Sequence, residues 1–228
     1  GEDEVRISLG GDGAVADRLF EAIHERQCTR STYESRLVPA EELKALEDAA
    51  RMAGCSLMLI TEKPRMEQIL ELILAANTAQ IADEAFVREL KHWLRFNPSE
   101  AIKHGDGLYA ACTGNPAMPS WIADLVFGFV FTAEAENAKC TGQVKSSAGF
   151  AVFVSDRNDK SHWVQAGRSY QRFALASTAL GIRHAFLNQP VEVAHYRAEL
   201  SSLLGIGDRR PDLVVRFGYS DAMPRSLR

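Results

Sequence analysis

The stretch GFAVFVSDRND at residues 149–159, with the segment that follows it, decides the fold class. Residues 150–155 form an unbroken apolar run that ends in the polar turn 156–159, a pattern typical of a short strand. Residues 163–180 then combine bulky apolar and small side chains over a length that predicts a long helix, and Gly181 is a natural left-handed stop. The second half of the chain is therefore expected to contain strands packed beside long helices.

The rest of the chain extends this pattern in both directions. Further strands are expected at residues 5–9, 56–60, 185–187 and 211–219. Further helices are expected at residues 14–27, 39–54, 64–94, 121–131, with Ser120 as N-cap, 133–140 and 193–204. The order is neither strict strand–helix alternation nor all-helical. It predicts an α+β fold in which a mixed or antiparallel sheet is flanked by long helices. We expect one domain over residues 1–228, with a long irregular arm at about 97–120 where glycine and proline are frequent.

Composition limits the classes of function. The chain has 228 residues, of which 46% are hydrophobic and 25% are charged, as is ordinary for a globular protein. Its formal net charge of −4 gives no reason to expect nucleic acid as a partner. The four cysteines form no Cys-x-x-Cys pair, and there is no His-Glu-x-x-His or Gly-x-Ser-x-Gly motif, so neither a metal site nor a hydrolase is indicated. Reduced thiols favour a cytoplasmic location, and no apolar run is long enough for a membrane span.

The stretch from Ile23 to Tyr33 contains two arginines, Arg26 and Arg30, four residues apart. If helical geometry continues this far, both guanidinium groups share one face and could bind one phosphate through planar, bidentate donors. The same spacing also suits an ordinary cationic helix end that complements the helix dipole. On spacing alone, the second interpretation is favoured.

The same stretch resembles the Arg-Arg-Ser-x-Arg-x-Phe opening of the nitroreductase family, which holds the phosphate and ribityl chain of FMN. Arg26, Gln27, Cys28 and Arg30 fall on its four polar positions, and Tyr33 lies near its aromatic position. Two positions depart from the pattern, because Gln27 replaces an arginine and Cys28 replaces a serine. The resemblance implies that these four residues contact FMN.

The second half of the chain resembles the same family. Residues 163–182 are similar to its long helix and glycine corner, and residues 213–219 are similar to its closing strand and basic tail. That tail implies that Arg225 and Arg228 reach the FMN phosphate. Residues 89–94, Asp106-Gly107 and residues 188–193 resemble a two-lobed subfamily associated with mycobacterial dormancy and with twin-arginine signals; this chain would correspond to its C-terminal part.

This resemblance implies an FMN-dependent oxidoreductase that takes hydride from NAD(P)H and reduces nitro or quinone-like acceptors. It also implies a homodimer, with the apolar residues 121–131 as one candidate for burial. The sequence identifies no catalytic acid or base. The family's Ala-Pro-Ser-x-x-Asn-x-Gln-Pro-Trp segment is missing, because residues 49–55 run directly into a strand. That absence favours the alternative of a non-catalytic relative that stores or senses flavin, or that serves as an interaction scaffold.

Overall fold

The computed structural model of the protein describes residues 18–113 and 117–225. Within them, four strands form one sheet in the order β1-β4-β6-β5, and every neighbouring pair is antiparallel. The strands are β1 (Cys55–Ile60), β4 (Gly149–Ser155), β5 (Arg183–Phe186) and β6 (Arg210–Gly218). The α+β class and the antiparallel sheet are confirmed. The strand expected at residues 5–9 lies outside the described residues.

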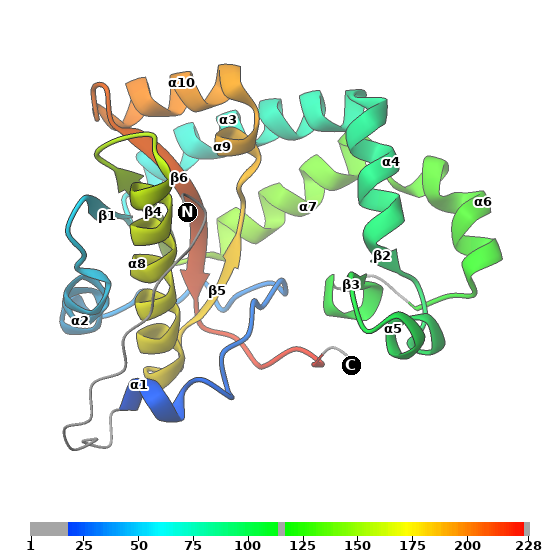
Figure 1. Cartoon of the computed structure of the whole chain (residues 1–228), viewed down its shortest axis with the longest axis horizontal. Coiled ribbons are helices and arrows are strands. Elements are labelled where there is room, and N and C mark those ends of the chain that lie inside the picture. Colours follow the sequence, from blue (N-terminus) through cyan, green and yellow to red (C-terminus); the bar gives the residue numbers. More distant parts are fainter. Residues whose placement is uncertain (1–17, 114–116, 226–228) are drawn as a thin grey trace, which may run out of the picture.

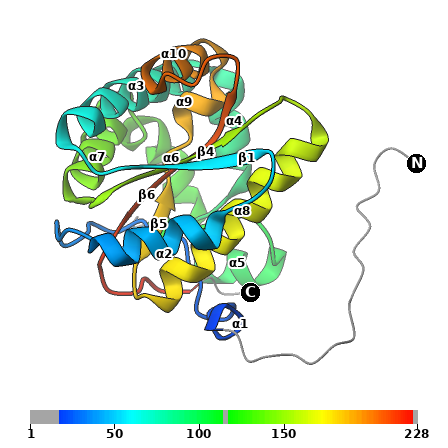
Figure 2. The same ribbon diagram turned by 90° about the vertical axis from the view of Figure 1, so that its left-hand side faces the viewer.

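Helices cover both faces of this sheet (Figure 2). One face carries α2 (Ala40–Ala50) and α8 (Lys160–Ala179); the other carries α3 (Lys63–Ala82), α7 (Ala133–Ser146), α9 (Gln189–Glu192) and α10 (Ala194–Leu204). The central strand β4 is buried along its whole length. Because side chains alternate between the faces of a strand, its apolar run supplies both cores at once. Phe150 faces α3 and α10, and Phe153, three residues further along the strand, faces α8.

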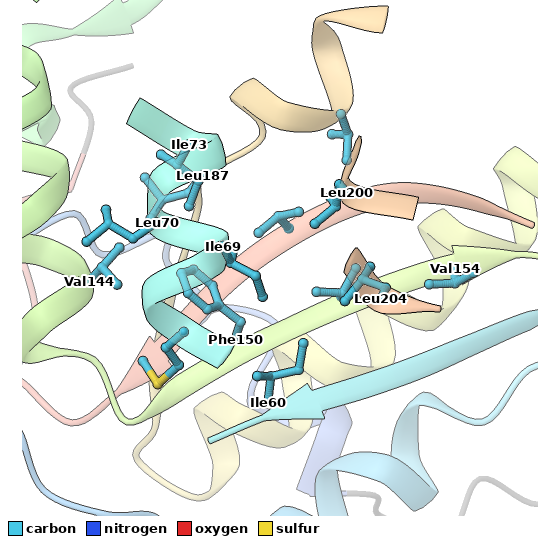
Figure 3. Packing of buried hydrophobic residues seen from close by; sticks show 14 of the residues in the cluster. Ile60, Ile69, Leu70, Ile73, Val144, Phe150, Val154, Leu187, Leu200 and Leu204 are labelled. Carbon is cyan, nitrogen blue, oxygen red and sulfur yellow. The ribbon is translucent and has the colours of Figure 1, made fainter. Parts of the chain in front are cut away.

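The second of these faces carries a core that joins β1, β4 and β6 to the four helices α3, α7, α9 and α10 (Figure 3). Phe150 and Ile60 are fully buried and lie opposite each other across the two strands. Helix α3 reaches them through a stripe of buried side chains spaced three or four residues apart, as in an amphipathic helix. The members of this stripe are Met66, Ile69, Leu70, Ile73, Ala76, Asn77 and Gln80. Two of these buried side chains are therefore amides rather than hydrocarbons.

The single helix expected over residues 64–94 is wrong, because the chain breaks at Asp83. Helix α3 ends at Ala82, and α4 (Glu84–Trp93) begins immediately afterwards. The Asp83 carboxylate accepts a hydrogen bond from the Ala85 backbone N–H at 2.8 Å and so caps α4. An aspartate that bonds to a nearby backbone N–H favours a helix start over a helix interior.

A group of short elements lies to one side of the sheet and its helices, and we call the described residues 84–113 and 117–131 the arm (Figure 1). After α4 it contains β2 (Leu94–Arg95), α5 (Pro98–His104), β3 (Leu108–Tyr109), a 3-10 turn η1 (Ala110–Thr113) and α6 (Ser120–Val130). In residues 97–113 and 117–120 the chain thus forms short regular elements that its glycine and proline content does not predict. Asn97 caps α5 by accepting from the Glu100 N–H at 3.0 Å, and Gly105 ends that helix at φ 65°.

Two features of α6 differ from expectation. Ser120 is the first residue of the helix rather than its cap, and its hydroxyl bonds to the Glu100 carboxylate of α5 instead. The apolar helix is also not fully buried. Trp121, Leu125 and Phe129 are 71%, 68% and 84% exposed, and their spacing of four residues places them on one outward stripe.

Candidate functional site

A cavity of about 650 Å³ lies between the arm and the helices α3, α7 and α9. Its wall on the arm side is apolar, and its wall on the opposite side is polar. The apolar wall is formed mainly by Phe86, Leu90, Leu94, Phe96, Val126 and Phe127. The polar wall is formed mainly by Arg30, Asn77, Gln80, Gln143, Asn188, Gln189 and Glu192. A ligand with a flat apolar body and polar edges would match both walls.

The amides of the polar wall are held in place by hydrogen bonds to neighbouring side chains. Gln80 donates to the Glu192 carboxylate at 2.6 Å, and Asn77 donates to the Asn137 carbonyl oxygen at 2.8 Å. Gln189 donates to the Asn77 side chain at 3.4 Å. Its own carbonyl oxygen is buried and has no hydrogen-bond partner among the residues that the structure describes. A buried acceptor left unpaired is costly, so this oxygen is suited to a donor on a bound molecule.

Arg30 reaches the cavity from an extended segment and not from a helix. Helix α1 (Arg18–Glu21) is short and is followed by a turn at residues 22–25. The helix expected over 14–27 is therefore wrong for residues 22–27, which are not helical. The Thr29 backbone N–H donates to the His184 carbonyl at 2.9 Å, and Cys28 pairs with His184 as an isolated bridge. This segment therefore bonds to the edge of β5, and Arg26 and Arg30 do not share a helical face.

The six candidate residues have different environments. Arg30 lines the cavity, whereas Arg26 is exposed and interacts with the Tyr170 hydroxyl. Cys28 is partly buried and does not line the cavity. Arg225 forms an exposed ion pair with Glu25 at 2.9 Å. Arg228 lies outside the described residues. Of the five candidates that the structure describes, Arg30 alone lines the cavity.

Gln27 fastens the C-terminal tail to this segment. Its amide nitrogen donates to the Met223 carbonyl at 2.8 Å and to the Pro224 carbonyl at 3.1 Å, while its oxygen accepts from the Met223 N–H at 3.0 Å. The Cys112 thiol of η1 also donates to the Pro224 carbonyl, at 3.5 Å. The two segments singled out in the sequence therefore lie side by side, although the Gln27 amide is occupied by the tail.

Burial keeps two neighbours of this segment, His184 and Tyr170, uncharged near pH 7. Desolvation lowers the pKa of His184 to about 4, and the charges of Arg26 and Arg183 lower it further in the same direction. Desolvation, with a smaller effect of Cys28, raises the pKa of Tyr170 to about 12. The Tyr170 hydroxyl lies 3.3 Å from the His184 Nε2. Both groups are therefore neutral near pH 7, and neither offers an anion that would compete for the neighbouring arginines.

Most of the polar wall was not identified from the sequence. Asn77 and Gln80 stand on the buried stripe of α3, at positions where its apolar pattern calls for hydrocarbon side chains. A polar residue on a buried stripe needs a partner, and this conflict was the available signal. Gln143 shows no such signal in the sequence, because α7 is polar on most of its surface.

No group of three or more His, Cys, Asp or Glu side chains in residues 18–113 and 117–225 is arranged to hold a metal ion. Over the same residues, no helix has both the length and the apolar character that crossing a membrane requires.

Comparison with known proteins bears on the architecture. No family model matches the sequence. Two curated proteins from two strains of Mycobacterium tuberculosis, both carrying the assignment NAD(P)H nitroreductase, are 24% identical over 208 residues. The match covers 89% of this chain and 56% of each relative, so the chain spans about half their length.

Solved structures match over nearly the whole chain. A nitroreductase with bound FMN from Bacteroides fragilis has a TM-score of 0.55 at 16% identity, covering 92% of this chain and 94% of that one. The FMN-dependent nitroreductase NfnB from Mycobacterium smegmatis, in complex with NADPH, has a TM-score of 0.57 at 16% identity, with coverage of 92% and 94%. This chain has the nitroreductase fold. The resemblance seen in the sequence is thereby confirmed at the level of the fold.

An iodotyrosine deiodinase bound to FMN and 3-iodo-L-tyrosine also shares this nitroreductase fold, with a TM-score of 0.58 at 11% identity and coverage of 91% and 92%.

In the present chain only residues 51–54 connect α2 to β1. None of these four residues lines the cavity. The missing polar segment between this helix and strand is therefore a property of the structure as well as of the sequence.

Proposed function

We propose that this chain is an FMN-binding oxidoreductase of the nitroreductase type. The observation that supports it is the position of Arg30, an arginine that lines a cavity with amide, aromatic and aliphatic side chains. Three other charged residues, Glu136, Lys139 and Glu192, also line this cavity. The nitroreductase fold of the chain and the FMN in solved structures of that fold agree with this proposal.

The residues of the cavity fit the parts of FMN. The Arg30 side chain can donate two parallel hydrogen bonds to a phosphate. The unpaired Gln189 oxygen matches the N–H donor that the flavin ring carries on its pyrimidine edge. The apolar side chains of α4 and α6 provide a surface for the faces of a planar ring. These roles compensate in part for the polar segment that is missing after α2.

FMN, when bound, supplies the hydride and electron transfer chemistry. The residues of this chain would bind and orient it, and the arm would keep water from the ring through its apolar wall. We propose NAD(P)H as the hydride donor, because both curated relatives are assigned to it. The acceptor would be a nitro or quinone-like compound. Burial raises the pKa of the Cys140 thiol, which lines the cavity, to about 11, so this thiol stays protonated near pH 7. We assign no proton transfer to the protein.

Replacing Arg30 by methionine is expected to raise the dissociation constant for FMN about 10- to 100-fold. The reason is that a hydrogen bond to a charged group contributes roughly 1.5–3 kcal/mol. Quenching of flavin fluorescence in a titration measures this constant. Arg157→Met is the matched control, since Arg157 is exposed in the turn after β4 and does not line the cavity. Equal FMN affinity of the Arg30→Met variant and the wild-type chain would remove the proposal's main support.

We also infer that two copies associate through α6. The stripe formed by Trp121, Leu125 and Phe129 is a contiguous apolar surface of the kind that proteins cover by association. Light scattering at micromolar concentration is expected to give about twice the chain mass of 25.2 kDa. Replacing Phe129 by aspartate should return the mass to that of one chain, whereas a wild-type monomer would contradict the inference.

A further inference from the structure

Arg216 is an arginine at the centre of the sheet, in β6, with an exposed fraction of 0%. A buried arginine normally has a carboxylate partner, because an unpaired charge is expensive to remove from water. In residues 18–113 and 117–225 the structure shows no ion pair for Arg216. Burial accordingly lowers the pKa of its guanidinium. Such a cost is retained in a fold where the residue has a specific task.

The contacts of Arg216 are with backbone carbonyls on either side of Arg30. Its Nη2 donates to the Ser31 carbonyl at 2.8 Å and to the Thr29 carbonyl at 3.4 Å. The guanidinium plane also stacks on the Tyr33 ring, 4.0 Å from its centroid. The Tyr33 hydroxyl donates in turn to the Thr29 carbonyl at 2.8 Å. Two residues thus fix the backbone that precedes and follows the cavity arginine.

The carbonyl of Arg30 itself is held by a third side chain. Gln143, on α7, donates to it from Nε2 at 2.9 Å. Arg216 Nη1 lies 3.5 Å from the Gln143 carbonyl, so the same guanidinium also contacts Gln143. We call Arg216, Tyr33 and Gln143, whose side chains bond to the backbone carbonyls around Arg30, the clamp. Three consecutive carbonyls, those of residues 29, 30 and 31, are therefore all accepting from side chains of the body. Arg216 does not line the cavity.

We propose that Arg216 is a positioning residue that aims Arg30 at the ligand phosphate. This inference rests on the proposed FMN function. An extended segment has no helix to orient its side chains, so external donors must fix its direction. A planar guanidinium can hold two carbonyls at a set separation, whereas a lysine ammonium offers a point charge on a flexible stem. The charge of Arg216 would therefore act through the backbone and not by touching the ligand.

Riboflavin has the flavin ring and ribityl chain of FMN but lacks the phosphate. Comparing the two ligands therefore separates a loss of phosphate binding by Arg30 from a general loss of protein stability. Arg216→Lys is expected to raise the dissociation constant for FMN about tenfold and to leave that for riboflavin unchanged. In the double variant Arg30→Met/Arg216→Lys, FMN should bind no more weakly than to Arg30→Met alone, since both changes remove the same interaction. Equal losses for both ligands, unchanged FMN affinity, or additive losses would each overturn the proposal.

Tyr33→Phe provides a second, milder variant in case Arg216→Lys does not fold. It keeps the ring under Arg216 and removes only the hydroxyl that bonds to Thr29. We expect a smaller loss of affinity in the same direction, for FMN and not for riboflavin. No difference between the two ligands in this variant would count against the clamp.

A readout without ligand keeps the inference separate from the proposed function. If the wild-type chain binds neither flavin, the FMN proposal fails, but the clamp can still be measured in the free protein. Arg216→Lys is then expected to speed hydrogen exchange of the backbone N–H of Thr29, which bonds to His184, while exchange in the central strand β4 stays slow. Unchanged exchange at Thr29 would show that Arg216 does not hold this segment.

Discussion

The protein is expected to lose about 3 kcal/mol of unfolding free energy through one side chain, His184, as the pH falls from 6.5 to 4. His184 is 1% exposed, and its Nδ1 is buried without a hydrogen-bond partner among the described residues. Desolvation, helped by the positive charges of Arg26 and Arg183, disfavours its protonation in the folded protein. The groups that face it otherwise, Tyr170 and Phe173, carry no charge.

The sign follows from comparing the two states. The folded pKa is about 4 and the unfolded pKa is near 6.5, so the unfolded chain binds the proton first as the pH falls. Stability is therefore lost between these two values, and His184 causes no further loss below the folded pKa. Replacing His184 by phenylalanine should abolish this part of the pH dependence.

Urea unfolding near neutral pH and again near pH 4.5 measures this effect. His195→Gln is the matched control, because the side chain of His195 is 76% exposed and pairs with Glu199 on the surface of α10. The control should keep the full pH dependence of the wild-type chain. If His184→Phe lost as much stability on acidification as the wild-type chain, His184 would not be the group responsible.

Replacing Phe150 by alanine is expected to cost about 3–5 kcal/mol of unfolding free energy. Phe150 is fully buried on β4, and its ring lies in the core between the sheet and α3. The helix layer it supports carries Asn77 and Gln80, so the polar wall of the cavity should loosen with it. Denaturant unfolding monitored by circular dichroism measures the change.

Phe20→Ala makes the same truncation on the surface. Phe20 is 68% exposed on α1, so the change should stay within about 0.5 kcal/mol of the wild-type free energy. Similar losses in the two variants would contradict the placement of Phe150 at the centre of the core.

The sequence was sufficient to predict the sheet and the long helices, because these depend on local patterns. The apolar run at 150–155 could be assigned to a strand since it is short and ends in a polar turn, and Gly181 marks the end of α8 at φ 72°. Asp83 could not be recognised as a break, because apolar spacing continues on both sides of it. The short elements of the arm were not predicted. Helix α5, which Asn97 caps, has 7 residues and is too short to show a helical period of apolar residues.

The candidate site was predicted only in part, for a physical reason. The sequence identified Arg30 and the neighbourhood of the C-terminal tail. The use of each side chain depended on tertiary contacts that no spacing reveals: Gln27 bonds to the tail, and Arg225 pairs with Glu25. The polar wall is assembled from α3, α7 and α9, which are far apart in sequence. Local sequence patterns could show that a polar residue lies at a position expected to be apolar. They could not show which of these residues lie close together in the folded chain.

The most direct test of the central claim is a titration of the purified wild-type chain with FMN, followed by quenching of flavin fluorescence. We predict saturable binding of one FMN per chain, tighter than that of riboflavin, and bleaching of the bound flavin on anaerobic addition of NAD(P)H. Fluorescence that stays unquenched at FMN concentrations far above that of the protein would contradict the assignment of this cavity to a flavin mononucleotide.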